Sequence, residues 1–116
     1  MAVLNFAAPI LPGKLKQWQA FHDEFKLGGP RRKEWEAQMK RAGITRQVVS
    51  LQKTPMGEFT VVFFEGPDPA AVMKNMATSS DPFDKWFALQ IKEIHGIDVK
   101  NPAPGPISQF MMDYKA

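Results

Sequence analysis

Two neighbouring segments that are apolar on both faces constrain the fold of this chain more than any other feature. Residues 44–53 and 59–65 are rich in β-branched and aromatic side chains, and a Pro- and Gly-containing turn separates them. Successive side chains of a strand point to opposite faces, so a strand with one face in water alternates apolar and polar residues. The second segment is apolar on both faces, with Phe59, Val61 and Phe63 on one and Val62 and Phe64 on the other. We therefore expect a hairpin whose two faces are both covered.

The remaining periodicity predicts a single domain over residues 1–116. Strands are expected at residues 3–8, 44–53, 59–65 and 107–114, and helices at residues 14–25, 30–42, 69–77 and 82–95. This order predicts an α+β fold of the ferredoxin-like split βαβ type, with extra helices and a four-stranded antiparallel sheet. The helices suffice to cover one sheet face only. We expect a second copy of the chain to cover the other, which makes the protein a homodimer.

Local signals mark the ends of several helices. Asp68 and Asp81 each precede a proline, a pattern that places a carboxylate at the N-cap and proline at the first helical position. Gly43 and Gly96 follow predicted helices and suit the left-handed conformation that ends them. Residues 101–106 are rich in proline and predict a rigid surface connection.

Composition narrows the class of protein. The chain is 44% hydrophobic and 23% charged, which is typical of a soluble globular domain. It has no cysteine, which excludes thiol catalysis and thiolate metal sites and favours a reducing compartment, so we expect a cytoplasmic protein. The N-terminal residues have no basic leader and no long apolar run, and we expect no membrane span.

Basic residues concentrate in residues 26–46, although the net charge is only +3. The segment is either a solvated helix face or a docking surface for an anionic ligand or an acidic partner. It lacks interleaved exposed aromatic residues, so we expect no nucleic-acid partner.

Several sequence blocks resemble a known superfamily. The run Pro12-Gly13-Lys14, followed by a helix with Trp18, Phe21 and Phe25, resembles the opening of the ferredoxin-like dimeric α+β barrel proteins, which include the antibiotic-biosynthesis monooxygenases. The blocks LQKTPMG, SDPFDKWF and EIHG resemble an uncharacterised bacterial branch of that superfamily. The resemblance implies a dimeric α+β barrel with back-to-back sheets and a pocket between sheet and helices. It implies no particular activity.

His95 is the strongest single candidate for chemistry. It ends a predicted helix, where the partial negative charge of the carbonyl groups favours a protonated imidazole. It is either an acid, base or ligand in a pocket or a cap on the last carbonyls of its own helix. His22, the only other histidine, lies within an apolar helical stripe and is expected at the margin of the core.

Two further polar residues are candidates for catalysis beside His95. Arg46 lies among apolar residues of a predicted strand, where it either pairs with Asp113 or Tyr114 or holds an anion in a cavity. Tyr114 lies on the last predicted strand. The predicted pocket residues are Asn5, Trp35, Trp86 and His95.

Asn5, Trp86 and His95 also follow the order of functional residues in haem-degrading monooxygenases of the superfamily. Trp86 and His95, however, are nine positions apart on one helix and point to nearly opposite sides of it, which disfavours a shared macrocycle. A metal site needs several converging ligands, and the two histidines are far apart in sequence, so we expect neither a metal site nor a cofactor.

The resulting hypothesis is a homodimer that binds a small organic molecule between sheet and helices. The alternative is a cofactor-independent monooxygenase or isomerase acting on a small organic substrate in the same pocket.

Overall fold

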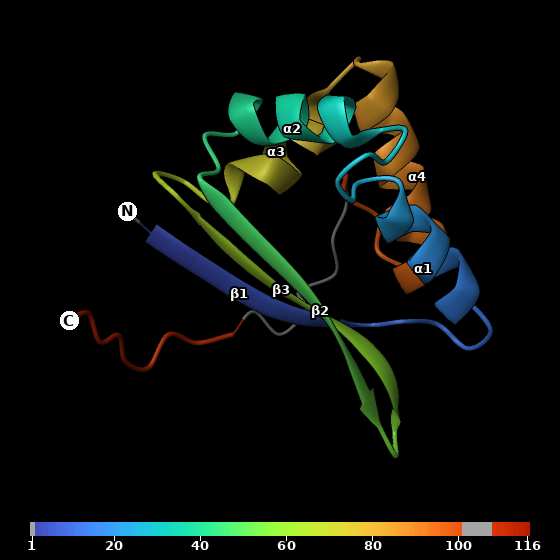
Figure 1. Ribbon diagram of the computed structural model, residues 1–116, viewed down its shortest axis with the longest axis horizontal. Coiled ribbons are helices and arrows are strands. Elements are labelled where there is room, and N and C mark those ends of the chain that lie inside the picture. The colour runs from blue at the N-terminus through green and yellow to red at the C-terminus, as the bar shows by residue number, and fades with distance from the viewer. Residues whose placement is uncertain (1, 101–107) are drawn as a thin grey trace.

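The computed structural model describes residues 2–100 and 108–116 as an α+β fold in which four helices lie on one side of a three-stranded antiparallel sheet (Figure 1). The predicted connection at residues 101–106 and the start of the last predicted strand at Ile107 lie outside the described residues. The elements are β1 (Ala2–Pro9), α1 (Leu15–Asp23), α2 (Arg32–Arg41), β2 (Arg46–Thr54), β3 (Gly57–Gly66), α3 (Ala71–Thr78) and α4 (Pro82–His95).

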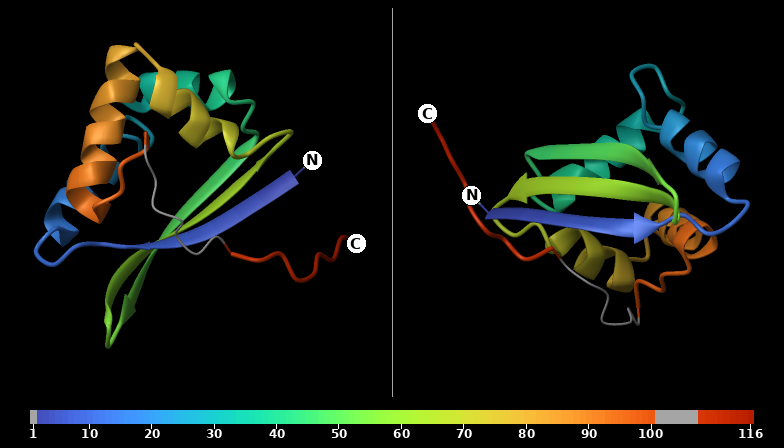
Figure 2. Two further views of the ribbon diagram at one scale, coloured as in Figure 1. Left: turned by 180° about the vertical axis from the view of Figure 1, so that it is seen from behind. Right: turned by 90° about the horizontal axis from the view of Figure 1, so that it is seen from below.

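The sheet has the order β1-β3-β2, with β3 between its two neighbours (Figure 2). The register pairs Thr60 with Ala8 on one side and with Leu51 on the other, so side chains of equal parity share a face across all three strands. Thr60, Val62 and Phe64 are buried beneath the helices, whereas their neighbours on β3 lie on the opposite face. The hairpin predicted from the two apolar segments is confirmed.

The sheet differs from the prediction in having three strands instead of four. Residues 108–116 form no strand and are exposed, and one backbone hydrogen bond, from Ser108 N–H to the Asn5 carbonyl at 3.3 Å, connects them to β1. Phe110, Met111 and Met112 project apolar groups in succession, and all three are exposed. Without a covering layer a strand gains no burial to offset the entropy of ordering it. The predicted four-stranded split βαβ sheet and the closed α+β barrel are therefore wrong for this chain, because the sheet is open.

Helix α4 has the bounds that the sequence predicted, because Asp81 caps its start and Gly96 ends it. The Asp81 carboxylate accepts hydrogen bonds from Phe83 N–H at 2.9 Å and Asp84 N–H at 3.2 Å, and Gly96 ends the helix at φ 73°. The parallel prediction for Asp68 is wrong. Helix α3 begins two residues after Pro69, its N-cap is Ala70, and no side chain caps it.

An aromatic cluster holds α1, the α1–α2 connection and α4 together. The Phe21 ring lies 4.9 Å from the Phe87 ring, and Phe25 contacts Phe83, Phe87 and Trp86 at 5.8–6.2 Å between centroids. These are the separations at which edge-to-face aromatic pairs stabilise a core. The helices are thereby fixed to one another as a layer.

A buried carboxylate adds a polar link between α2 and α4. Asp84 accepts hydrogen bonds from Gln38 Nε2 at 2.9 Å, Arg41 at 2.8 Å and Ser79 Oγ at 2.7 Å. Two of these donors are on α2 or at its end, so the carboxylate fixes where α2 crosses α4. The side chain is buried yet fully engaged, as buried charges require.

The other face of the sheet carries none of the four helices. Val48, Phe63 and Asn5 lie across this face in register, and Val48 is 40% exposed. No helix among the described residues is long and apolar enough to cross a membrane.

Candidate functional site

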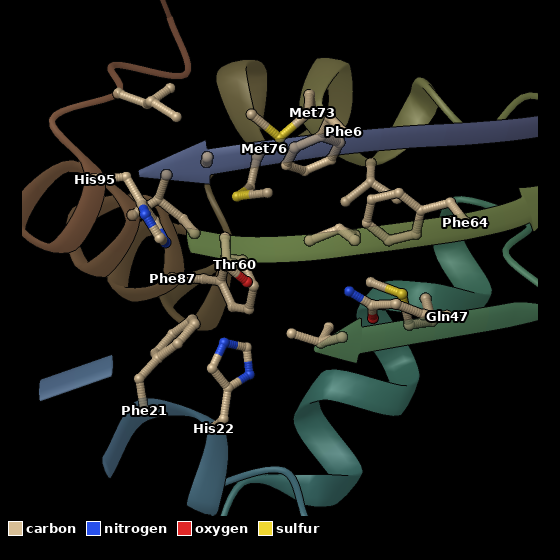
Figure 3. A pocket seen from close by; sticks show the side chains of 17 residues that line it. Phe6, Phe21, His22, Gln47, Thr60, Phe64, Met73, Met76, Phe87 and His95 are labelled. Atoms are coloured by element: carbon tan, nitrogen blue, oxygen red, sulfur yellow. The ribbon is translucent and has the colours of Figure 1, made fainter. Parts of the chain in front are cut away.

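A cavity of about 70 Å³ lies between the helical layer and the sheet (Figure 3). All four helices and all three strands contribute to its lining. Most of the lining is aliphatic, aromatic or thioether, and it comes from Phe6, Ala8, Phe21, Met39, Val49, Val62, Phe64, Val72, Met73, Met76, Phe87, Ile91 and Ile97. Four polar side chains interrupt it, namely His22, Gln47, Thr60 and His95. A mainly apolar hollow with a few polar groups is the usual form of a small-molecule site.

Two of the polar groups come from the covered face of the sheet. Gln47 and Thr60 share the side-chain parity of Val49 and Val62, which places them under the helices. Thr60 Oγ1 and Gln47 Oε1 are buried and have no hydrogen-bond partner within the described part of the chain. A buried polar atom left in this way costs free energy, which a water molecule or a ligand would offset.

His95 is held at the end of α4 by the chain that leaves β1. Its Nδ1 lies 2.7 Å from the Pro9 carbonyl oxygen, and Leu11 N–H donates to the Ile94 carbonyl at 2.9 Å. A carbonyl oxygen only accepts, so Nδ1 carries the proton and Nε2 of the neutral ring keeps its lone pair. The ring therefore does not cap its own helix, which was one of the two interpretations of the sequence.

Burial governs the ionisation of His95. It lowers the pKa of His95 below the ordinary value of 6.5, and the hydrogen bond to Pro9 opposes this shift. The side chain is 7% exposed and no charged residue lines the cavity among the described residues. The imidazole is thus neutral at neutral pH.

His22 reaches the same cavity from α1. Its ring lies 4.5 Å from the Trp18 ring and 5.0 Å from the Phe21 ring. Burial, followed by the charge of a protonated His95, lowers the pKa of His22 to about 4, with Asp23 acting in the opposite direction. Two neutral imidazoles therefore face one hollow at neutral pH.

Of the four pocket residues predicted from sequence, His95 is the one that lines the cavity. Asn5 lies on the helix-free face of β1, opposite Phe63 in the register. Trp35 stacks on Phe25 at 6.0 Å, and the Trp86 ring lies 4.0 Å beneath the Arg31 guanidinium. The structure does not bring these four residues together.

The three candidate catalytic residues are also separated. Arg46 lies on β2, where its guanidinium is 5.7 Å from the Phe63 ring on the helix-free face. Together with Trp35 and Lys40 it borders a second, more open hollow of about 200 Å³ at the outer edge of α2 and β2. Tyr114 and Asp113 are exposed in the segment after residue 107. Among the described residues, no ion pair or hydrogen bond joins either of them to Arg46.

Much of the basic segment at residues 26–46 takes part in local contacts. Arg31 pairs with Glu34 at 3.6 Å, and Arg32 pairs with Glu36 at 2.7 Å and also donates to the Phe25 carbonyl. Arg41 bonds the buried carboxylate between α2 and α4. These contacts stabilise the α1–α2 connection and α2, and the segment's role in binding stays a prediction.

Sequence reasoning missed Thr60, Gln47 and His22 as site residues. For Thr60 and Gln47 the available signal was a polar residue in the middle of a mainly apolar strand face. Such a face must be covered, so a polar side chain on it lies inside the fold. For His22 the signal was its position within an apolar helical stripe.

Within residues 2–100 and 108–116, no three His, Cys, Asp or Glu side chains converge in a way that could hold a metal ion. Neither the family models nor the curated proteins compared with this sequence contain a match. The cavity and its four polar side chains are therefore the features of this structure that bear on function.

Proposed function

We propose that this protein binds a small, largely apolar organic molecule in the cavity between the sheet and the helices. The observation that carries the proposal is the pair of unpartnered oxygens, Thr60 Oγ1 and Gln47 Oε1, within an apolar lining. The apolar walls supply affinity through burial, and the polar atoms supply orientation. The absence of cysteine in the sequence supports a cytoplasmic location for this function.

The size of the cavity indicates a ligand of about one ring. Its 70 Å³ corresponds to roughly five water molecules at about 10–15 Å³ each. Met39, Met73 and Met76 lie in the wall, and their unbranched side chains can adapt to a somewhat larger occupant.

A cofactor-independent isomerase or monooxygenase is the second candidate, and it uses the same cavity. The observation in its favour is the neutral His95, whose free Nε2 can accept a proton from a bound substrate. Arg46 and Tyr114 lie elsewhere, so such an enzyme would depend on His95 and His22. A haem-degrading activity is not supported, because Asn5 lies on the other face of the sheet.

Methionine methyl groups give a direct test of binding. In a sample labelled with ¹³C at methionine methyls, toluene is expected to shift the signals of Met39, Met73 and Met76. Met56, Met111 and Met112 are 80–92% exposed and serve as internal controls. Shifts confined to the exposed methionines, or none at saturation with toluene, would contradict the proposal.

A matched pair of variants on β2 locates the ligand. Val49 lines the cavity, whereas the adjacent Val48 lies on the helix-free face. Val49→Phe is expected to fill the hollow and abolish the toluene-induced shifts. Val48→Phe adds the same volume to the opposite face and is expected to leave them unchanged. Equal effects of the two substitutions would place the ligand outside the cavity.

The protein is also proposed to form a homodimer through the helix-free face of the sheet. Val61 and Phe63 lie at the centre of this face, and Phe110 and Met112 are exposed in the segment that meets β1 at Ser108. A second copy would cover both the sheet face and this apolar segment, and two-fold pairing is the commonest assembly of soluble proteins.

A further inference from the structure

Three of the cavity's polar groups face a common space. Figure 3 shows His22, Thr60 and His95 directed toward the same side of the cavity, while Gln47 lies apart from them. The protonation of His95 acts on the pKa of His22, as expected for two rings that are near each other. A ligand on this side of the cavity therefore lies near all three groups.

The hydrogen-bonding capacity of His95 is already half used. Its Nδ1–H donates to Pro9, which leaves the Nε2 lone pair, an acceptor with no partner among the described residues. Thr60 Oγ1 has no partner there either, and a hydroxyl both donates one hydrogen bond and accepts others. This end of the cavity thus offers a fixed acceptor beside a group with a free donor.

The lack of charge in the lining narrows the ligand further. No Lys or Arg among the described residues lines the cavity, so a carboxylate would face the His95 lone pair without a compensating cation. No Asp or Glu lines it either, so an ammonium group would lack a counter-ion. A neutral group that both donates and accepts matches the site.

Resting on the proposed function, we propose that the occupant is a small ring bearing a hydroxyl group, a phenol or ring alcohol, bound through His95 Nε2 and Thr60 Oγ1. The ligand hydroxyl donates to Nε2 and accepts from the threonine hydroxyl. Its ring lies against the apolar walls formed by Phe6, Val62 and Phe87. An N–H donor such as that of indole satisfies Nε2 but gives the Thr60 hydrogen no acceptor.

Phenol and toluene test this inference as a matched pair, because both are a single benzene ring and phenol carries a hydroxyl group where toluene carries a methyl group. Dissociation constants for both are measured from the cavity methionine signals in the wild type and in Thr60→Val, which has nearly the same shape. The ratio of the toluene to the phenol constant is expected to fall about 5–10-fold in Thr60→Val, the effect of one hydrogen bond. Toluene affinity itself is expected to change little.

His95→Leu gives a second, independent measurement and is expected to lower the same ratio by a similar factor. His95→Leu also removes the hydrogen bond to the Pro9 carbonyl and could prevent folding. In that case the measurement on Thr60→Val alone tests the inference. In ¹⁵N-histidine spectra of the wild type, phenol is expected to shift the signal of the unprotonated nitrogen of His95, and toluene to leave it in place. A purely structural role for His95 would produce no such difference.

The outcomes separate this inference from the proposed function. If both probes bind in the cavity and their ratio is the same in wild type and Thr60→Val, the hydroxyl assignment is wrong and the binding function stands. If neither probe shifts the cavity methionines, the binding function itself is wrong.

Discussion

At the scale of single residues, burial outweighs the helix end in setting the charge of His95. The sequence indicated that the carbonyl end of α4 would favour a protonated ring. In the structure the pKa of His95 is lowered, because removal from water disfavours the charged form. The favourable effect of a helix end is at most about 1–2 kcal/mol and falls off within a turn.

The pKa of His22 makes a prediction about pH. The native pKa is about 4 and the ordinary value is 6.5, so the unfolded chain binds the proton more readily. The burial of neutral His22 therefore costs no stability above about pH 6.5, and the free energy of unfolding falls as the pH drops from there toward 4. Between pH 7 and pH 5 the free energy of unfolding is expected to drop by about 2 kcal/mol from His22 alone.

Urea denaturation at both pH values checks this in the wild type and in His22→Phe. The variant cannot titrate at this position, so its loss of stability over the same interval is expected to be smaller by about 2 kcal/mol. An identical pH dependence in the two proteins would mean that His22 is protonated in the native state near its ordinary pKa.

The unpartnered hydroxyl of Thr60 predicts an unusual response to substitution. Thr60→Val removes a buried group without a partner and is expected to leave the free energy of unfolding unchanged or raise it by about 1 kcal/mol. Thr54 provides the control, because its Oγ1 donates to Gly57 and accepts from Met56 N–H. Thr54→Val is expected to cost about 1 kcal/mol, and equal losses at both positions in urea denaturation would contradict the assignment.

At the scale of elements, two Asp-Pro pairs that look alike in sequence behave differently. Asp81→Ala is expected to lower the free energy of unfolding by about 1 kcal/mol, because it removes the acceptor for two N–H groups at the start of α4. Asp68→Ala removes only an exposed ion pair with Lys74 at 3.8 Å and is expected to cost less than about 0.5 kcal/mol. Thermal or urea denaturation of both variants measures the difference, and equal costs would mean that Asp68 also acts as a cap.

The same comparison shows which elements could be predicted from sequence. The hairpin and α4 could be predicted from local signals. The alternation of side chains along a strand determines which residues share a face, and an N-cap residue together with a left-handed glycine determines where a helix begins and ends. The fourth strand did not, because a strand at residues 107–114 depends on a covering layer that the described chain lacks.

The site was only partly predictable for a related reason. His95 could be found from its helix end, but Trp35 and Trp86 could not be assigned to core or pocket because aromatic side chains serve both. Thr60 and Gln47 could not be assigned to the site because their neighbours across the sheet depend on the strand register, which the structure reveals.

At the scale of the whole molecule, the open sheet face predicts the oligomeric state. Light scattering coupled to size exclusion is expected to give twice the chain mass of 13.1 kDa. Val61→Lys places a charge at the centre of the face and is expected to yield a monomer. Leu89 is 52% exposed on α4, so Leu89→Lys is a matched control that should remain dimeric. A well-folded wild-type monomer at micromolar concentration would contradict the dimer.

The hairpin extends well past the helical layer, and the turn at residues 55–56, which joins β2 to β3, lies at its end away from the helices (Figure 1). Met56 at its tip is 92% exposed and does not line the cavity. Exposed turns of this kind accept insertions readily. The tip is accordingly a good attachment point for a fluorophore or a solid support, through which occupancy of the distant cavity could be followed without touching its walls.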